Sequence, residues 1–170
     1  MRILFTIDHQ DYDEKMKVRE CCCVRAVIRK EGKLAVQKGT RGDYKILGGG
    51  IDAGETMTEA LLREVREEAG LVIKPETIKS LGETIEKHRD LFGKQEVFLR
   101  HCYFFACEVA EKQVPCEMTE SEMEVGYHLV WETPQNILAA NQPFMEESWI
   151  YRDTEFVRML VENKIEIGEE

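Results

Sequence analysis

Three acidic side chains with helical spacing are the first feature of the sequence that could do chemistry. Glu64, Glu67 and Glu68 fall within an arc of about 100° if this segment is a helix, because successive helical residues are rotated by about 100°. The neighbouring arc is apolar and holds Leu61, Leu62, Val65 and Ala69. One side of the predicted helix is therefore expected to pack, while the adjoining edge carries a cluster of carboxylates.

Such a cluster is unfavourable for an isolated helix. Negative charges near a helix C-terminus oppose one another and the helix dipole, at roughly a few tenths of a kcal/mol for each placement. Hard divalent cations such as Mg²⁺ bind oxygen ligands, keep several waters and bridge to substrate phosphates. We therefore expect the cluster to form an open half-site for a divalent cation. The alternative is a solvated acidic face relieved by Arg63 and Arg66.

The segments around the cluster carry clear structural signals. Thr56, with Glu59 three residues later, is typical of a capping box, and Gly70 is typical of a helix stop, so the spacing predicts a helix over 57–69. Upstream, a short predicted strand over 44–47 leads into glycines at 48–50, where a backbone carbonyl can approach the carboxylate edge. A simple tight turn is the alternative for these glycines.

The glycines and the helix together match a known pattern. The pattern begins with Gly49, and after five intervening residues comes Glu55. Seven residues further on it continues with Arg63-Glu64-Val65, followed by Glu67-Glu68 and Gly70-Leu71, each after a gap of one residue. This pattern resembles the Nudix box of the Nudix hydrolases, without a departure inside the box. Just outside it, Leu47 stands where many members have proline, which concerns the rigidity of the loop more than the chemistry. The resemblance implies a mixed α/β fold, the Nudix α/β/α sandwich.

The resemblance also implies a metal site. Glu67 and Glu68 would bind divalent ions, with Mg²⁺ as the cofactor and Mn²⁺ as a substitute. Glu64 would be a further ligand or would orient the attacking water. The backbone carbonyl of Gly48, one place before the box, would supply another ligand. A metal held in this way activates water and screens the charge of a pyrophosphate.

Two further roles for acidic residues follow from the resemblance. Glu55 would pair with Arg63 and brace the glycine loop against the helix. In many members an additional catalytic carboxylate comes from a later loop, and Glu120 or Glu122 is the candidate here. The alternative for these two residues is a solvated acidic loop.

Phosphate contacts require local cations, because the chain as a whole is acidic. Lys38, Arg41 and Lys45 lie close to the glycine loop in sequence, and Arg25 is a candidate to lie close to it in space. We expect the substrate-binding cations among them. For each residue taken alone, an ordinary surface charge is the alternative.

Length and composition exclude several classes of protein. The 170 residues fit one domain over 1–170 that can form a core without an oligomer, and a homodimer is compatible with this size. The net charge of −10 disfavours non-specific binding to nucleic acid or to an anionic membrane. Apolar runs are too short for a membrane span, and neither a signal-peptide pattern nor a CxxC pair is present. We expect a cytoplasmic protein with reduced thiols.

The remaining segments predict a mixed sheet with helices on its faces. A β-hairpin is expected from 18–29 and 34–37, with further strands at 71–73, 77–86, 95–109 and 127–131. Helices are expected at 134–140 and 153–163, with Asp153 as the N-cap of the second.

The function expected from the resemblance is hydrolysis of a phosphoric anhydride. The substrate would be a nucleoside diphosphate linked to another moiety, cleaved by Mg²⁺-assisted attack of water. A nucleoside triphosphate, ordinary or oxidised, is the first candidate, because the Pro or Tyr expected soon after the box in branches that act on ADP-ribose or dinucleoside polyphosphates is missing. One alternative is a non-catalytic regulator that binds a nucleotide or sugar-nucleotide, although such domains commonly lose box acids. Another is a prenyl diphosphate isomerase, whose Cys and Glu positions cannot be located here.

Overall fold

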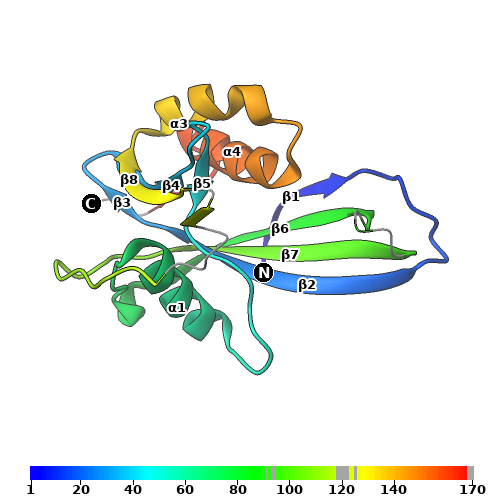
Figure 1. Cartoon of the computed structure of the whole chain (residues 1–170), viewed down its shortest axis with the longest axis horizontal. Helices are drawn as coiled ribbons and strands as arrows, with labels where there is room; N and C mark the ends of the chain where they lie inside the picture. The colour runs from blue at the N-terminus through cyan, green and yellow to red at the C-terminus, as the bar shows by residue number, and fades with distance from the viewer. Residues whose placement is uncertain (91, 93–94, 118–122, 125, 168–170) are drawn as a thin grey trace.

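Two β-sheets with helices on opposite sides form the computed structural model of the chain (Figure 1). The structure describes residues 1–90, 92, 95–117, 123–124 and 126–167. The first sheet is four-stranded, in the order β1-β6-β7-β2. Its strands are β1 (Ile3–Asp8), β2 (Lys17–Val27), β6 (Lys79–Arg89) and β7 (Glu96–Ala106). The sheet is mixed: β6 and β7 are antiparallel, whereas β1 lies parallel to β6 and β2 lies parallel to β7.

The second sheet surrounds β4. It contains β3 (Arg29–Lys30), β4 (Lys33–Lys38), β5 (Tyr44–Ile46) and β8 (His128–Glu132). The predicted hairpin is only partly right. β3 and β4 form it across a tight turn in which Glu31 and Gly32 have positive φ, but β2 belongs to the other sheet. Ile28, which is 1% exposed, is the residue at which the chain passes from the first sheet to the second.

The helices enclose the two sheets. They are α1 (Met57–Ala69), α3 (Pro134–Asn141) and α4 (Ser148–Val161), with short 3₁₀ turns at Pro75–Thr77 and Gln142–Phe144. Figure 1 shows α1 on one side of the sheets and α3 and α4 on the other, while the far end of the first sheet extends beyond them. Among the residues that the structure describes, no helix combines the length and the apolar character needed to cross a membrane.

Alternation along β2 separates two cores. Val24 and Ala26 pack with Leu61 and Val65 of α1, in what we call the α1-side core. The intervening residues face the other way, and Cys23 belongs to the α4-side core. In that core Phe104 of β7 stacks on Phe156 of α4, with ring centroids 4.1 Å apart. Both faces of β2 are therefore buried near the glycine loop.

Three expectations about the elements are wrong. Residues 71–73 form no strand, and only an isolated bridge joins Ile73 to Val109. The strand β1 was not expected at all. Asp153 is not an N-cap: α4 begins at Ser148, and the buried Asp153 carboxylate instead accepts a hydrogen bond from the backbone N–H of Ile46 at 2.9 Å. A carboxylate that satisfies a β5 donor holds α4 against the second sheet.

Candidate active site

The helix that carries the acidic cluster forms as its sequence predicts. Thr56 Oγ1 accepts from the N–H of Glu59 at 3.2 Å, and Glu59 Oε2 accepts from the N–H of Thr56 at 2.8 Å, which completes the capping box. At the other end Gly70 adopts φ 63° and donates its N–H to the carbonyl of Arg66. Gly70 ends the helix because a left-handed residue without a Cβ reverses the chain there. Helix 57–69 is confirmed.

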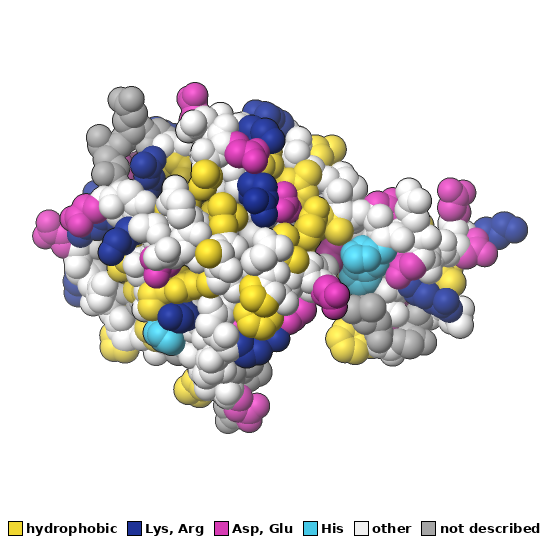
Figure 2. Space-filling model, turned by 90° about the horizontal axis from the view of Figure 1, so that it is seen from above, with side chains coloured by type: hydrophobic (Ala, Val, Ile, Leu, Met, Phe, Trp, Pro, Cys, Tyr) yellow, Lys and Arg dark blue, Asp and Glu magenta, His cyan; other side chains and the backbone are white. Residues whose placement is uncertain are grey.

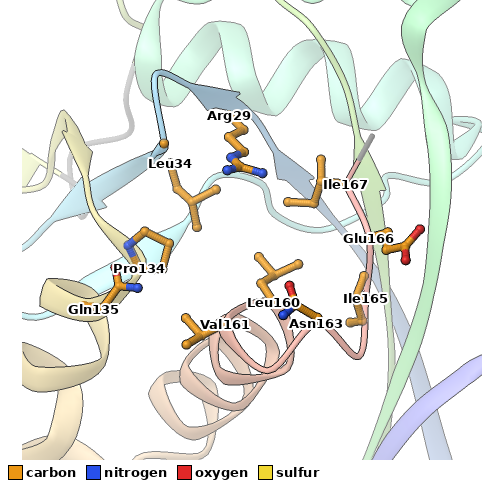
Figure 3. A pocket seen from close by; sticks show the side chains of 11 residues that line it. Arg29, Leu34, Pro134, Gln135, Leu160, Val161, Asn163, Ile165, Glu166 and Ile167 are labelled. Carbon is orange, nitrogen blue, oxygen red and sulfur yellow. The ribbon is translucent and has the colours of Figure 1, made fainter. Parts of the chain in front are cut away.

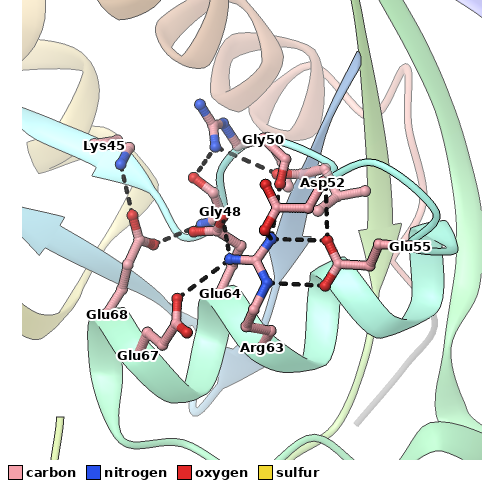
Figure 4. A network of polar contacts seen from close by, with 11 residues as sticks. Lys45, Gly48, Gly50, Asp52, Glu55, Arg63, Glu64, Glu67 and Glu68 are labelled. Carbon is pink, nitrogen blue, oxygen red and sulfur yellow. Dashed lines mark hydrogen bonds and ion pairs between the residues drawn. The ribbon is translucent and has the colours of Figure 1, made fainter. Parts of the chain in front are cut away.

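Glu68 is the buried member of the cluster. It is 1% exposed, and its carboxylate accepts from the N–H of Gly48 and from Nζ of Lys45, both at 2.6 Å (Figure 4). These two bonds tie α1 to the end of β5 and to the first glycine of the loop. Lys45, predicted to contact substrate phosphate, is therefore placed at the acidic edge as an ion-pair partner of Glu68.

Glu64 lies against the glycine loop. A Cβ added to Gly49 would overlap the Glu64 carboxylate, so a side chain at this position would displace that carboxylate. Burial raises the pKa of Glu64, the hydrogen bond from Arg63 lowers it, and the nearby charge of Glu68 raises it again. Glu64 is thus a partly desolvated carboxylate beside another carboxylate, an arrangement common at sites built for chemistry.

Gly49→Ala is expected to lower kcat/KM for the best substrate by about tenfold or more, because the new methyl group displaces the Glu64 carboxylate and small misplacements at a reacting centre are costly. Gly50→Ala is the matched control, since a Cβ at Gly50 meets nothing within 4 Å. Steady-state kinetics of both variants are the measurement. Equal kinetics in the two variants would contradict the importance of this close approach.

Arg63 connects the rest of the acidic edge (Figure 4). It makes two hydrogen bonds to Glu55, at 2.8 and 2.9 Å, and one to the carbonyl of Gly50 at 2.9 Å. It also donates to Glu64 at 2.8 Å and to Glu67 at 3.2 Å. A single guanidinium thus holds the loop and two of the cluster carboxylates in register, and its planar donor geometry suits the bidentate contact.

The pKa of Glu55 shows the same pairing. Hydrogen bonds from Arg63 first, and then from the backbone N–H of Asp52, lower the pKa of Glu55 from 4.5 to about 2. Because the pKa is lowered in the folded state, the stabilisation is fully present above pH 4.5 and is lost as the pH falls towards 2. The brace between loop and helix is therefore intact near neutral pH.

Arg63→Ala is expected to lower both the melting temperature and the hydrolysis rate, because it leaves Glu55 without its bidentate partner and releases Glu64 and Glu67. Arg66→Ala, on the same helix, is the control: Arg66 is 59% exposed in its side chain and reaches only Glu117, at 3.5 Å. Thermal melts and kinetics of both variants test the difference. Wild-type melting and wild-type rate in Arg63→Ala would refute the bracing role.

The carbonyl of Gly48, predicted as a metal ligand, contacts a cation in this arrangement. Nη1 of Arg25 donates to it, so Arg25 does lie beside the glycine loop. Gly48 has φ 126°, and a Cβ there would overlap the backbone of Val24, which fixes glycine at this position. The signal for Arg25 in the sequence is a single arginine within an apolar strand segment, Cys21 to Ile28.

The other predicted site residues are not brought to the acidic edge or are not described. Lys38 lies over the ring of Tyr44, with Nζ 5.5 Å from the centroid. Arg41 pairs with Glu147 at 2.7 Å and with Asp43 at 3.6 Å. Phosphate contacts by these two residues remain a prediction. Glu120 and Glu122 fall outside the described residues, so their predicted role also remains a prediction.

The donor set fits a hard divalent cation. The donors are the carboxylate oxygens of Glu64, Glu67 and Glu68 and the backbone oxygen of Gly48. They lie near the glycine loop, where a side chain at Gly49 would displace the Glu64 carboxylate. Within the described parts of the chain, no three acidic, His or Cys side chains already converge on one point. The physical reason at this edge is that Arg63 and Lys45 hold the carboxylates as ion pairs. A divalent ion would compete with these two cations for the carboxylate oxygens.

A cavity lies away from the acidic edge of α1. It measures about 480 Å³ and lies between β3 and β4, the start of α3 and the chain after α4 (Figure 3). Leu34, Leu160 and Ile165 contribute apolar side chains to it, and none of the box acids lines it. Over the face of the molecule seen in Figure 2, Lys and Arg side chains are interspersed with Asp and Glu. The carboxylate chemistry is therefore concentrated at the edge of α1.

Comparisons with known proteins point to one family. A family model described as "NUDIX domain" matches residues 19–151. A Bacillus subtilis (strain 168) protein named "Putative 8-oxo-dGTP diphosphatase YtkD" is 32% identical over 131 residues, which cover 77% of this chain and 73% of that protein. Nudix hydrolase 2 of Arabidopsis thaliana is 28% identical over 124 residues, covering 70% of this chain but 40% of the plant protein.

A solved structure supports the fold. The structure titled "NUDIX hydrolase from Nitrosomonas europaea" superimposes with a TM-score of 0.58 at 20% identity, over 81% of this chain and 87% of that one. The similarity includes the α/β/α arrangement that the box resemblance implied. With the family model covering most of the chain, from β2 to α3, the chain belongs to the Nudix family of hydrolases, which act on phosphoric anhydride bonds.

Proposed function

We propose that the protein hydrolyses a nucleoside diphosphate linked to another moiety, with a nucleoside triphosphate, ordinary or oxidised, as the first substrate class. The observation that carries the proposal is the contact of the acidic edge of α1 with the glycine loop: the Glu64 carboxylate lies against Gly49, and Glu68 accepts from the N–H of Gly48. The 8-oxo-dGTP diphosphatase name of the Bacillus relative supports the triphosphate class.

The carboxylates of Glu67 and Glu68 and the carbonyl of Gly48 would hold Mg²⁺ or Mn²⁺, and Glu64 would be a further ligand or the group that orients the attacking water. When bound, such an ion supplies activation of water and screening of the pyrophosphate charge. The donors project from one helix and one loop, and Arg63 and Lys45 fix their spacing. A site held by rigid elements positions its ligands before substrate arrives.

The chain's own residues also handle the proton. The Glu64 carboxylate, whose pKa is raised chiefly by burial, is the box acid best suited to accept a proton from the attacking water. Arg63, with a raised pKa caused first by its hydrogen bonds to Glu55, stays charged and keeps the Glu64 oxygens oriented. In this proposal the Glu64 carboxylate accepts the proton, and Arg63 holds that carboxylate in position.

A panel of nucleotides tests the proposal. Nucleoside triphosphates, their 8-oxo forms, nucleoside diphosphate sugars and dinucleoside polyphosphates are incubated with the protein and Mg²⁺, and released phosphate, pyrophosphate and nucleotide are quantified. We expect turnover to be fastest with a triphosphate. Tight binding of a nucleotide or sugar-nucleotide with no turnover anywhere in the panel would overturn the proposal in favour of a binding module.

A further inference from the structure

An open cavity of about 720 Å³ runs along β2 directly beside the glycine loop. Its lining includes Glu20 to Cys23 and Arg25 of β2, Gly49 and Gly50 of the loop, and Arg100 of β7. The loop is attached to this edge of β2, because Cys23 and Gly50 form a bridge. We call this cavity the β2 groove; Gly48, whose carbonyl the proposed function uses, is adjacent in sequence to its wall.

The β2 groove is locally basic in an acidic protein. Its charged lining consists of Arg25, Arg100 and Glu20, two cations to one anion, whereas the whole chain has a net charge of −10. Glu20 has a 61% exposed side chain and lies 3.7 Å from His101. The acidic group is therefore the solvated one, and the cations lie deeper. Hydrolysis at the acidic edge does not require this basic wall.

Arg25 is buried with incomplete pairing. Its side chain is 7% exposed and lies 3.9 Å from the Asp153 carboxylate. Its Nη1 donates to the carbonyls of Val24 and Gly48, whereas its buried Nε has no hydrogen-bond partner among the residues that the structure describes. Asp153 is already paired with Arg152 at 2.8 Å, so two buried guanidinium groups share one carboxylate. Two buried cations that share one carboxylate leave an excess of positive charge at this wall, which favours an anion bound next to it.

Arg100 is held in place by its neighbours but stays partly exposed. Its guanidinium carbon lies 4.8 Å from the ring centroid of Phe98, and its Nη1 reaches Glu86 at 3.5 Å. Its side chain is 30% exposed. Arg19 stacks on the same ring at the same distance, 4.8 Å, but pairs with Asp90 at 2.7 Å and does not line the groove. A stacked guanidinium with five N–H donors and a partly exposed side chain suits a phosphate.

We propose that Arg25 and Arg100 bind, in the β2 groove, a free phosphate group that the substrate carries beyond the anhydride to be cleaved. This inference rests on the proposed function and narrows it. A nucleoside triphosphate presents such a group, whereas a nucleoside diphosphate capped by a neutral sugar does not. The groove therefore selects triphosphates, and Arg100 is a specificity-determining residue.

Pyrophosphate binding in excess EDTA tests the groove without metal or turnover. Titration calorimetry is expected to give affinity at least about tenfold weaker for Arg100→Gln than for wild type, because a charge-assisted contact is lost. Arg19→Gln, which removes the same stacking but no groove contact, should bind within about twofold of wild type. Equal affinity of wild type and Arg100→Gln, or an equal loss in Arg19→Gln, would overturn the proposal.

Kinetics separate this inference from the proposed function. In Arg100→Gln we expect KM for a nucleoside triphosphate to rise at least about tenfold, while kcat/KM for a nucleoside diphosphate sugar stays within about twofold. If Arg100→Gln turns over both substrates with the same preference as wild type, the groove assignment alone would be overturned. Pyrophosphate binding that depends on Arg100, in a protein that turns over no nucleotide, would instead defeat the proposed function and leave the anion site standing.

Discussion

Glu67→Gln is expected to lower the hydrolysis rate by at least about 10²-fold, roughly 2.7 kcal/mol of barrier, while the protein stays folded. The amide keeps the size of the side chain but removes the charge of a proposed metal ligand. Glu67 suits this test because its side chain is 35% exposed. Arg63, which pairs with Glu67, would still pair with Glu55 and Glu64 in the variant, so little stability should be lost. Steady-state kinetics with the best panel substrate give the rate.

Glu59→Gln is the matched control on the same helix. Glu59 serves the capping box through Thr56 and makes no contact with the glycine loop, so its variant should retain nearly the wild-type rate. Glu68→Gln should also lose activity but is less informative. Its carboxylate is buried and holds both Lys45 and Gly48, so stability falls with the rate. Wild-type turnover in Glu67→Gln would contradict the metal site and favour the alternative that the cluster is a solvated acidic face.

Removal of divalent ions is expected to abolish hydrolysis. In excess EDTA the rate should fall to the uncatalysed background, and Mg²⁺ or Mn²⁺ should restore it, because carboxylates paired with Arg63 and Lys45 offer no activated water. Far-UV circular dichroism in EDTA should match the spectrum with Mg²⁺, since Arg63 and Lys45 hold the edge without a metal. Full turnover in EDTA would sink the metal-assisted mechanism.

The parts of the site that the sequence predicts well are local. Helix 57–69 depends on Thr56, Glu59 and Gly70, all within or next to the segment, and its acidic edge follows from the rotation per residue. The close approach of Glu64 to Gly49 follows from the box pattern, since the helix begins only a few residues after the loop. Neighbouring residues decide such features, so a single sequence carries them.

The sheets are less predictable because their contacts join distant segments. β1 pairs with β6, which begins more than 70 residues later, and nothing near Ile3 indicates that partner. Residues 18–37 alternate like one hairpin, yet the chain changes sheets at Ile28 because β7 takes β2 as its neighbour. Strand propensity alone does not choose between such partners.

Polar residues with distant partners are harder to assign for the same reason. Asp153 has the residue type of a helix cap, but Ile46 and Arg152 use its carboxylate within the protein interior. Lys45 suggests a phosphate contact by its position near the loop, and the structure pairs it with Glu68. The sequence offers Arg25 as a candidate to lie near the loop, and the pairing of Cys23 with Gly50 places it beside Gly48.

Metal binding by the acidic edge is the central claim, and Mn²⁺ titration followed by electron paramagnetic resonance measures it without substrate. Wild type and Glu59→Gln should bind Mn²⁺ with the same affinity, and Glu67→Gln should bind at least about tenfold more weakly, because it lacks one charged oxygen ligand. Equal Mn²⁺ affinity in all three proteins would contradict the assignment of Glu67 to the metal site.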